Sequence, residues 1–288
     1  MKCYICGSGK IVLVSGKLRY KTVQKAYKCL KCGLVFLYPK MNKVQEKKFY
    51  EKEYGIVFSK EKGTTPEDLF NARQNDAAIY YELTKKFIKK SCDCLEIGCA
   101  SGYFLNYIKN KVNSISGIES HILLRGYCEK IGVKIFDDTE SIKNKKFDII
   151  FMFFVVEHLS DPIKFFSKLK GLLKKNGKII VEVPNVEDAL LTLYDIPAFK
   201  QYYFTPAHSF YYSKKTLALL FKKVGYQKFN IEYLQRYDLS NHMYWMMYGK
   251  PGGLGKFNNV FSEKLRLDYK IDLMTCGRSD TLFAVISI

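Results

Sequence analysis

The 288-residue sequence lacks any long apolar segment. Its longest uninterrupted apolar run covers residues 149–156, far short of the roughly 20 residues that a membrane-spanning helix requires. The opening residues, MKCYICGSGK, carry no apolar run behind the first lysine and so do not resemble a secretory signal. We therefore expect a cytoplasmic protein with no membrane span.

Acidic residues and arginines are also scarce. The chain has 47 Lys and Arg against 28 Asp and Glu, a formal net charge of +19, yet only six of its basic residues are Arg. A basic surface attracts polyanions, but arginine is the side chain that contacts phosphate through two hydrogen bonds. Because the lysines are spread along the whole chain, a general lysine-rich composition is favoured, and a nucleic acid or anionic sugar remains the alternative partner.

Cysteine, in contrast, is plentiful, and four of the nine cysteines form two C-x-x-C pairs, each followed by a glycine. Two such turns can place four thiolates tetrahedrally around one Zn²⁺, with no open position for an activated water. The segments between the pairs alternate like short strands around a Ser-Gly turn. We predict a structural zinc ribbon over residues 1–45 with ligands Cys3, Cys6, Cys29 and Cys32. Redox dithiols and unrelated buried cysteines are the alternatives.

From residue 76 to the end, helical and strand patterns alternate. Fully apolar strands alternating with amphipathic helices are typical of a parallel sheet covered on both faces. The predicted strands cover residues 92–98, 114–120, 133–136, 147–154 and 177–184, and the predicted helices cover 76–90, 102–110, 121–132 and 162–175. The fold class is therefore α/β, a doubly wound Rossmann-like sheet, and residues 46–75 are assigned to a linker or lid.

The segment LEIGCASGYFL, residues 95–105, runs from a buried strand through a glycine turn into a helix. It lacks the dinucleotide fingerprint G-x-G-x-x-G, because Ala and Tyr occupy the later glycine positions. Its E-x-G-x-x-x-G pattern resembles motif I of the class I S-adenosylmethionine (SAM) methyltransferases. The resemblance implies that Gly98 and Gly102 let the backbone approach SAM and that Glu96 receives the methionine ammonium. Cys99 is expected to be a small buried residue under the cofactor, with a reactive nucleophile as the alternative.

Further cofactor-binding residues follow from the same resemblance. Glu119 closes the next predicted strand, where an acidic side chain would accept both ribose hydroxyls. Ser120 beside it is counted among the cofactor-binding residues, and Asp138, or its neighbour Asp137, is assigned to the adenine amino group. The stretch FDIIFMFFVVEHLSDP resembles the fourth-strand region of the small-molecule branch of the family. An α/β domain with an incidental glycine turn is the alternative.

The last hundred residues carry the features that concern the acceptor. The pattern H-x-x-x-x-S, here His208 and Ser213, resembles the family's route to the sixth strand, and TLFAVISI is expected to be an antiparallel seventh strand. Residues 235–280 replace the usual short hairpin and are too long for a turn. We predict that they form a substrate cap within a methyltransferase domain of residues 76–288. The alternative is a helix that only covers the sheet.

Candidate catalytic and substrate-binding residues lie around this predicted cap. His158 and His208 are the leading general bases, because both fall at the carboxyl edge of the sheet. Aromatic rings beside planar polar groups are also suited to a sugar. The substrate-contacting set, which includes two tyrosines of the lid segment, is Tyr50, Tyr54, Arg236, Asn241 and His242, and His242 is a weaker candidate for the base.

The acceptor is expected to be a sugar or a related small metabolite. The chain resembles bacterial methyltransferases encoded with surface-polysaccharide enzymes, and its ribbon resembles that of zinc-containing sugar methyltransferases. The carbon-methylating members carry a further large C-terminal domain that this sequence does not include, so a hydroxyl or amine acceptor is favoured. One alternative is an RNA methyltransferase, against which stands the absence of the Asn/Asp-Pro-Pro-aromatic motif after the fourth strand. The other is a non-catalytic SAM-binding protein.

Overall fold

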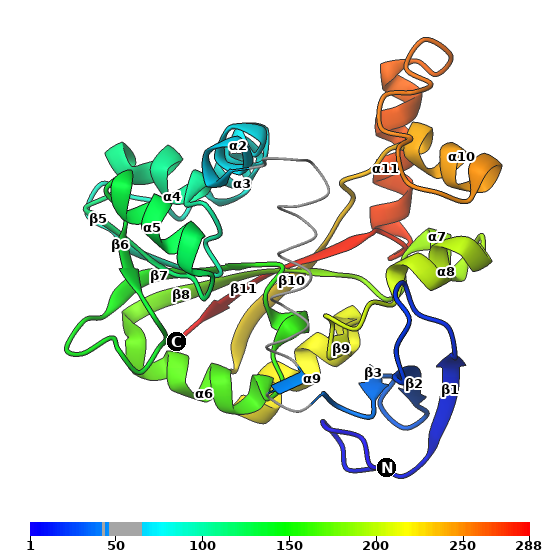
Figure 1. The fold of residues 1–288 in the computed structure, drawn as a ribbon, viewed down its shortest axis with the longest axis horizontal. Helices are drawn as coiled ribbons and strands as arrows, with labels where there is room; N and C mark the ends of the chain where they lie inside the picture. Colours follow the sequence, from blue (N-terminus) through cyan, green and yellow to red (C-terminus); the bar gives the residue numbers. More distant parts are fainter. Residues whose placement is uncertain (42–43, 46–64) are drawn as a thin grey trace.

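The strands of the described residues form two sheets (Figure 1). This computed structural model describes residues 1–41, 44–45 and 65–288. The predicted lid tyrosines, Tyr50 and Tyr54, lie outside the described residues. None of the described helices is long and apolar enough to cross a membrane.

The larger sheet has seven strands in the order β10-β11-β8-β7-β4-β5-β6. The strands are β4 (Asp93–Ile97), β5 (Ser114–Ile118), β6 (Lys134–Phe136), β7 (Phe147–Phe153), β8 (Leu173–Pro184), β10 (Lys228–Leu234) and β11 (Thr281–Ser287). Strands β4 to β8 pair in parallel, whereas β11 is antiparallel to both of its neighbours, β8 and β10. The predicted sheet and its antiparallel last strand are confirmed. The strand order reverses between β4 and β7, and their carboxyl ends therefore flank the crevice where ligands bind in such sheets.

Helices cover both faces of this sheet (Figure 1). They include α2 (Pro66–Ala72), α3 (Gln74–Thr84), α4 (Tyr103–Ile108), α5 (Ile122–Lys130), α6 (Pro162–Leu172) and α9 (Lys214–Val224). Phe166 of α6 packs in one core cluster with Ile150 of β7, and Phe104 of α4 packs in a second cluster with Phe151. Successive β7 side chains thus enter opposite layers, which explains why the strand is apolar throughout.

Helix α3 is shorter than the sequence pattern predicts. The pattern extends to residue 90, but the helix ends at Thr84, whose hydroxyl donates to the Tyr80 carbonyl oxygen at 2.6 Å. Four lysines follow at positions 85, 86, 89 and 90, so like charges would lie one turn apart on a continued helix. That repulsion opposes the predicted extension.

The smaller sheet joins the N-terminal segment to the main domain. Its strands are β1 (Ile11–Ser15), β2 (Lys25–Cys29), β3 (Val35–Tyr38) and β9 (Phe210–Tyr211), all paired antiparallel. Phe36 of β3 faces Phe210 of β9 in register, and both side chains belong to the main core cluster. The N-terminal segment therefore shares hydrogen bonds and buried apolar surface with the rest of the chain.

The segment between β10 and β11 contains two helices, α10 (Leu239–Tyr248) and α11 (Glu263–Thr275). They stand at the end of the sheet where α7 (Ala189–Thr192) and α8 (Pro197–Tyr203) also lie (Figure 1). Trp245 of α10 is 3% exposed, and its ring centroid lies 4.9 Å from that of Phe199 in α8. This edge-to-face contact fixes α10 against α8.

Candidate functional site

The turn after β4 has the backbone geometry that its glycines allow. Gly98 has φ +72°, and a Cβ atom there would lie 2.7 Å from a methyl group of Val155. Gly102 has φ +73° and begins helix α4. Between them Ala100 has φ +48°, a conformation that costs a residue with a side chain about 1–2 kcal/mol. Backbone strain of this kind clusters at active sites and ligand-binding turns, so the geometry is compatible with the predicted cofactor turn.

The two glutamates assigned to the cofactor lie on either side of this turn. Glu96 is 2% exposed, its Oε2 atom has no hydrogen-bond partner among the described residues, and burial raises its pKa well above the usual value. Glu119 accepts hydrogen bonds from the amides of Ala100, at 3.0 Å, and His121, at 2.8 Å. Glu119 therefore also ties the turn to the end of β5, a contact that was not predicted from the sequence.

Cys99 lies beneath the turn with 1% of its surface exposed. Its hydrogen bond with Cys128, followed by burial, raises its pKa well above the usual value, so the thiolate is disfavoured. Gly117 of β5 is required by the same packing, because a Cβ atom there would lie 2.5 Å from the Cys99 sulfur. Gly117 was not among the predicted site residues, although a glycine inside a strand signals close approach.

The other two predicted cofactor residues are exposed. The Ser120 hydroxyl lies 3.5 Å from Glu119 Oε1. Asp138 accepts a hydrogen bond from the Ser141 amide at 2.8 Å, and its neighbour Asp137 pairs with Arg125. Ser120 follows the carboxyl end of β5, and Asp138 follows that of β6. Both residues therefore lie on the side of the sheet switch point where an adenosine would lie.

A cavity of about 430 Å³ opens beyond the carboxyl ends of β7 and β8. It brings together residues that are far apart in the sequence, including all the described acceptor-side residues that were predicted from the sequence: His158, His208, Arg236, Asn241 and His242. Arg19 of the N-terminal segment also lines it, with its guanidinium carbon 4.2 Å from the centroid of the Tyr202 ring. The cavity therefore draws its walls from the ribbon, the sheet and the 235–280 segment.

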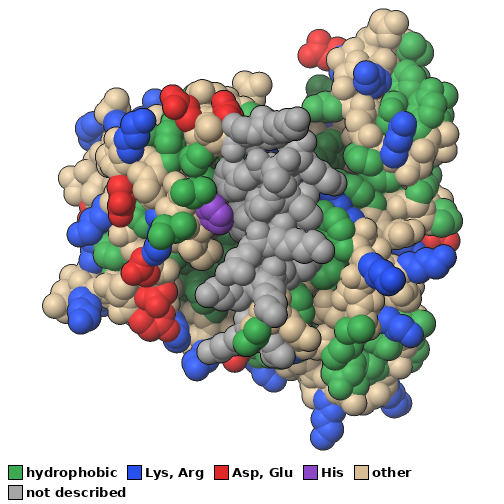
Figure 2. Space-filling view, viewed as in Figure 1, with side chains coloured by type: hydrophobic (Ala, Val, Ile, Leu, Met, Phe, Trp, Pro, Cys, Tyr) green, Lys and Arg blue, Asp and Glu red, His purple; other side chains and the backbone are tan. Residues whose placement is uncertain are grey.

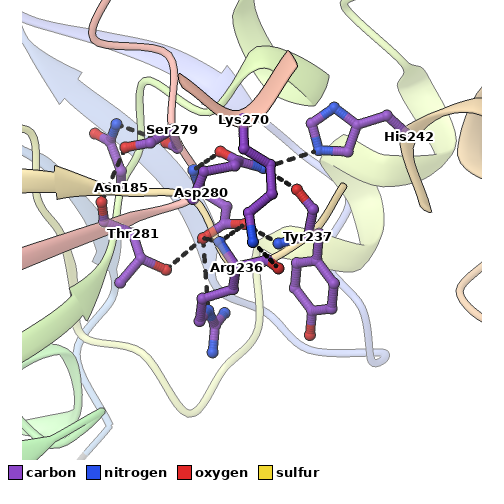
Figure 3. A network of polar contacts seen from close by, with 9 residues as sticks. Asn185, Arg236, Tyr237, His242, Lys270, Ser279, Asp280 and Thr281 are labelled. Atoms are coloured by element: carbon purple, nitrogen blue, oxygen red, sulfur yellow. Dashed lines mark hydrogen bonds and ion pairs between the residues drawn. The ribbon is translucent and has the colours of Figure 1, made fainter. Parts of the chain in front are cut away.

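Asp280 fixes Arg236 at this cavity (Figure 3). The buried Asp280 carboxylate accepts from the backbone amides of Arg236 and Tyr237, each at 3.0 Å, and from the Thr281 hydroxyl at 2.6 Å. It also lies 3.5 Å from Arg236 Nε. The Arg236 guanidinium carbon lies 4.4 Å from the centroid of the Phe154 ring, which lines the cavity. Asp280 thus anchors the chain where it leaves β10 and where it returns to β11.

His158 and His208 face each other with ring centroids 4.6 Å apart. His158 Nδ1 donates to the Ala207 carbonyl oxygen at 3.1 Å. Burial lowers the pKa of His158 to about 4, and burial, followed by the repulsion that a protonated His158 would exert, lowers the pKa of His208 well below its usual value. Both rings are therefore neutral at pH 7. A base with so low a pKa removes a proton less effectively than one poised near 7.

The third histidine of the cavity, His242, has hydrogen-bond partners at both ring nitrogens. Its Nδ1 atom lies 2.7 Å from the Tyr269 hydroxyl, and its Nε2 atom lies 3.4 Å from the Gln235 amide nitrogen. Burial lowers its pKa to about 4. With both ring nitrogens occupied, His242 joins α10 to α11 and to the end of β10, which does not favour it as a base.

The four N-terminal cysteines converge. Their sulfur atoms all lie within 4.8 Å of one another, with 3.5 Å between Cys3 and Cys32 and 3.6 Å between Cys6 and Cys29. Zn–S bonds of about 2.3 Å at tetrahedral angles would separate the sulfurs by roughly 3.8 Å. The donor type, number and spacing fit a structural Zn²⁺.

Comparison with known proteins identifies the family to which the chain belongs. A family profile described as "Methyltransferase domain" matches residues 70–230. The chain belongs to the methyltransferase domain family. The matched range contains the strained turn, Glu96, Glu119 and both facing histidines, but neither the four cysteines nor the 235–280 segment.

Curated proteins and solved structures also resemble this methyltransferase domain. The tRNA U34 carboxymethyltransferase of Campylobacter jejuni is 30% identical over 135 residues, which are 42% of this chain and 46% of that protein. The chain thus spans about half the length of the curated relatives that it matches first. An uncharacterized protein of Methanocaldococcus jannaschii is 26% identical over 149 residues, covering 51% of this chain and 69% of that protein. A SAM-dependent methyltransferase of Archaeoglobus fulgidus shares the fold, with a TM-score of 0.52 and 17% identity over 82% of this chain and 99% of that one.

The methyltransferase domain also contains two buried glutamates to which no role was assigned from the sequence: Glu157, which was expected to face the site beside His158, and Glu182, which was not expected there. Glu157 is 1% exposed and Glu182 is fully buried, and none of their carboxylate oxygens has a hydrogen-bond partner among the described residues. Burial raises the pKa of Glu157 to about 8 and that of Glu182 to about 7. The sequence did contain a signal for Glu182, because it is the one charged residue in the apolar run IIVEV and therefore falls inside a buried strand. Asp280 and Arg19 gave no such signal, since their partners are distant in the sequence.

Proposed function

We propose that this protein transfers a methyl group from SAM to a small polar acceptor held in the 430 Å³ cavity. The observation that carries the proposal is that the glycine turn after β4 adjoins the cavity. Val155 packs against Gly98 of the turn, while Phe154, just before it, and Glu157, two residues after it, line the cavity. A donor lying on the turn and an acceptor in the cavity would therefore meet at the segment that follows β7.

The chemistry requires little beyond alignment and removal of one proton. The acceptor oxygen or nitrogen attacks the methyl carbon of the sulfonium, the carbon–sulfur bond breaks with its electron pair going to sulfur, and S-adenosylhomocysteine leaves. Holding the two reactants in line can supply roughly 7–11 kcal/mol of the barrier reduction. The proton of the acceptor must leave, and His158 and His208 are the candidate bases at this cavity.

A sugar, nucleotide sugar or related metabolite fits the lining of the cavity. Aromatic residues supply faces for stacking on the apolar side of a sugar ring, and Arg236 and Asn241 supply planar donors for hydroxyl or phosphate groups. The aromatic lining residues are Phe154, Phe199, Tyr202, Tyr203, Tyr237 and Trp245. We assign the 235–280 segment to a substrate cap on the same grounds.

The proposal includes one structural Zn²⁺ held by the four N-terminal cysteines. Its role is indirect: it fixes the ribbon, whose strand β3 pairs with β9 just after His208 and whose Arg19 lines the cavity. Four thiolate ligands leave the ion no open position, so it contributes folding energy and takes no part in methyl transfer.

An RNA acceptor is the second candidate, favoured by the name of the Campylobacter jejuni relative, which refers to a tRNA nucleoside. The formal charge of +19 is also suited to a polyanion. On the face drawn in Figure 2, however, Lys and Arg side chains are distributed around the molecule and do not gather in one patch. A continuous basic surface is the usual footprint of a nucleic-acid site.

Incubation with methyl-labelled SAM decides between the two acceptors. One arm contains a panel of nucleotide sugars and the other contains total tRNA, with heat-inactivated protein as the control in each. We expect label in a nucleotide sugar or its product and none in tRNA. Label in tRNA alone would transfer the proposal to the RNA candidate, and label in neither arm, with SAM bound, would favour a non-catalytic SAM-binding protein.

A further inference from the structure

The acceptor cavity contains a second group of metal-ligating side chains, separate from the four cysteines. One ligand atom from each of Glu157, His158 and His208 lies within 4.8 Å of the other two. All three residues line the cavity. Glu157 and His158 belong to the short 3₁₀ turn η2 (Val156–His158) after β7, and His208 precedes β9.

Two of these side chains have buried polar atoms without a partner. Within the described residues, neither carboxylate oxygen of Glu157 has a hydrogen-bond partner, and Nδ1 of His208 has none. Removing an unpaired carboxylate from water costs several kcal/mol, and a buried imidazole nitrogen without a partner adds to that cost. One bound cation would satisfy the carboxylate and the imidazole together.

The third side chain is oriented as metal-binding histidines are. His158 Nδ1–H donates to the Ala207 carbonyl oxygen at 3.1 Å, so Nε2 is the nitrogen that would coordinate a metal. A backbone carbonyl in this position fixes the ring and raises its strength as a ligand. The same backbone contact also ties His158 to the residue just before His208.

We propose that Glu157, His158 and His208 bind one divalent transition-metal ion at the acceptor cavity. Two imidazoles and one carboxylate favour Zn²⁺, Mn²⁺, Fe²⁺ or Co²⁺ over Mg²⁺, which prefers oxygen ligands alone. Three protein ligands leave open positions for a further ligand.

The role of this ion rests on the proposed function. An acceptor hydroxyl in an open position would lose its proton to water near neutral pH, because a bound cation lowers the pKa of its ligand. The resulting oxygen anion attacks the methyl carbon, the carbon–sulfur bond breaks toward sulfur, and the products are the methyl ether and S-adenosylhomocysteine. The ion would then replace a histidine base, since both imidazoles serve as ligands.

Cobalt binding tests the site without any methyl acceptor. Protein is dialysed against a chelator until one zinc per chain remains in the cysteine site, and Co²⁺ is then added while its absorption is recorded. We expect one Co²⁺ per chain with weak d–d bands and no thiolate charge-transfer band, since nitrogen and oxygen ligands give none. Glu157→Gln and His208→Ala should each weaken binding by at least the roughly 10- to 100-fold that loss of an outer-shell partner causes.

Tyr203→Phe, which changes the same cavity but removes no ligand, should bind Co²⁺ like the wild type. Absence of Co²⁺ binding to the wild type would overturn the proposal even if the variants fail to fold, and so would binding that both variants retain. Titration with S-adenosylhomocysteine runs in parallel. Cofactor binding without Co²⁺ refutes only the metal site, whereas Co²⁺ binding without cofactor refutes only the proposed function.

Discussion

At the scale of single residues, the glycine turn is the most constrained feature of the site. Gly98→Ala would place a methyl group 2.7 Å from Val155 in a backbone conformation with φ +72°. We expect this variant to lower the free energy of unfolding by at least about 1–2 kcal/mol, the cost of a left-handed conformation for a residue with a side chain. We also expect it to weaken S-adenosylhomocysteine binding. Urea unfolding and calorimetric titration measure the two effects.

Gly126→Ala is the matched control. Gly126 lies inside helix α5 and does not have a positive φ, and a Cβ atom added there would meet no atom within 4 Å apart from its chain neighbours and the adjacent backbone of the same helix. Alanine is about 1 kcal/mol more favourable than glycine inside a helix, so this variant should be as stable as the wild type or more so. Equal stability of Gly98→Ala and Gly126→Ala would contradict the geometry assigned to the turn.

At the scale of secondary-structure elements, a cluster of charges joins four strands at the end opposite the crevice. Lys174 of β8 lies 2.6 Å from Asp93 of β4 and 2.8 Å from Asp148 of β7, and Asp93 also accepts a hydrogen bond from Ser114 of β5 at 2.5 Å. Although burial acts to raise it, the pKa of Asp93 is lowered to about 2 by the hydrogen bonds from Lys174, Ser114 and Asn113. These bonds require the ionised carboxylate.

This lowered pKa predicts an acid-dependent contribution to stability. Because the folded pKa of Asp93 is below the unfolded value of about 3.9, the stabilisation is complete above pH 4 and is lost as the pH falls toward 2. Asp93→Asn should therefore be less stable than the wild type at pH 6, and the difference should shrink as the pH falls. Chemical unfolding at several pH values measures it, and a constant difference between pH 6 and pH 2.5 would contradict the prediction.

The ribbon is the second element that can be tested on its own. If four thiolates hold Zn²⁺, a strong chelator should remove about one zinc per chain and expose the amides of β2 and β3 to hydrogen exchange, while β4 and β7 remain protected. Mass-spectrometric hydrogen exchange with zinc analysis measures both. Full protection of β2 and β3 in metal-free protein would contradict a structural role for the metal.

The same scale explains which features of the fold were predictable. The central strands follow from apolar runs and the turn from its glycines, because these signals are local. The predicted end of α3 was wrong. The apolar pattern continues past Thr84, but the hydrogen bond of the Thr84 hydroxyl and the repulsion among the four lysines that follow oppose a longer helix. The pairing of β3 with β9 joins residues far apart in the sequence and leaves no local pattern.

At the scale of the whole molecule, the candidate site is assembled by contacts that no segment encodes alone. Asp280 positions Arg236 from 44 residues away, and Arg19 reaches the cavity from the ribbon. The sequence nevertheless pointed to all five described acceptor-side residues that line the cavity, because each lies near the carboxyl edge of the sheet or in the 235–280 segment. Glu157 was expected to face the site but received no role, and Glu182 was not expected there, because burial without a hydrogen-bond partner cannot be read from the sequence.

Titration of S-adenosylhomocysteine into the wild type and Glu119→Ala is the decisive measurement for the cofactor site. We predict saturable binding to the wild type and a loss of about 10- to 100-fold in the variant, the equivalent of charge-assisted hydrogen bonds worth about 1.5–3 kcal/mol. Glu129→Ala, which removes an exposed glutamate from helix α5, should bind like the wild type. Equal affinity of Glu119→Ala and the wild type, with both folded, would contradict the placement of the cofactor at the β4 and β5 edge.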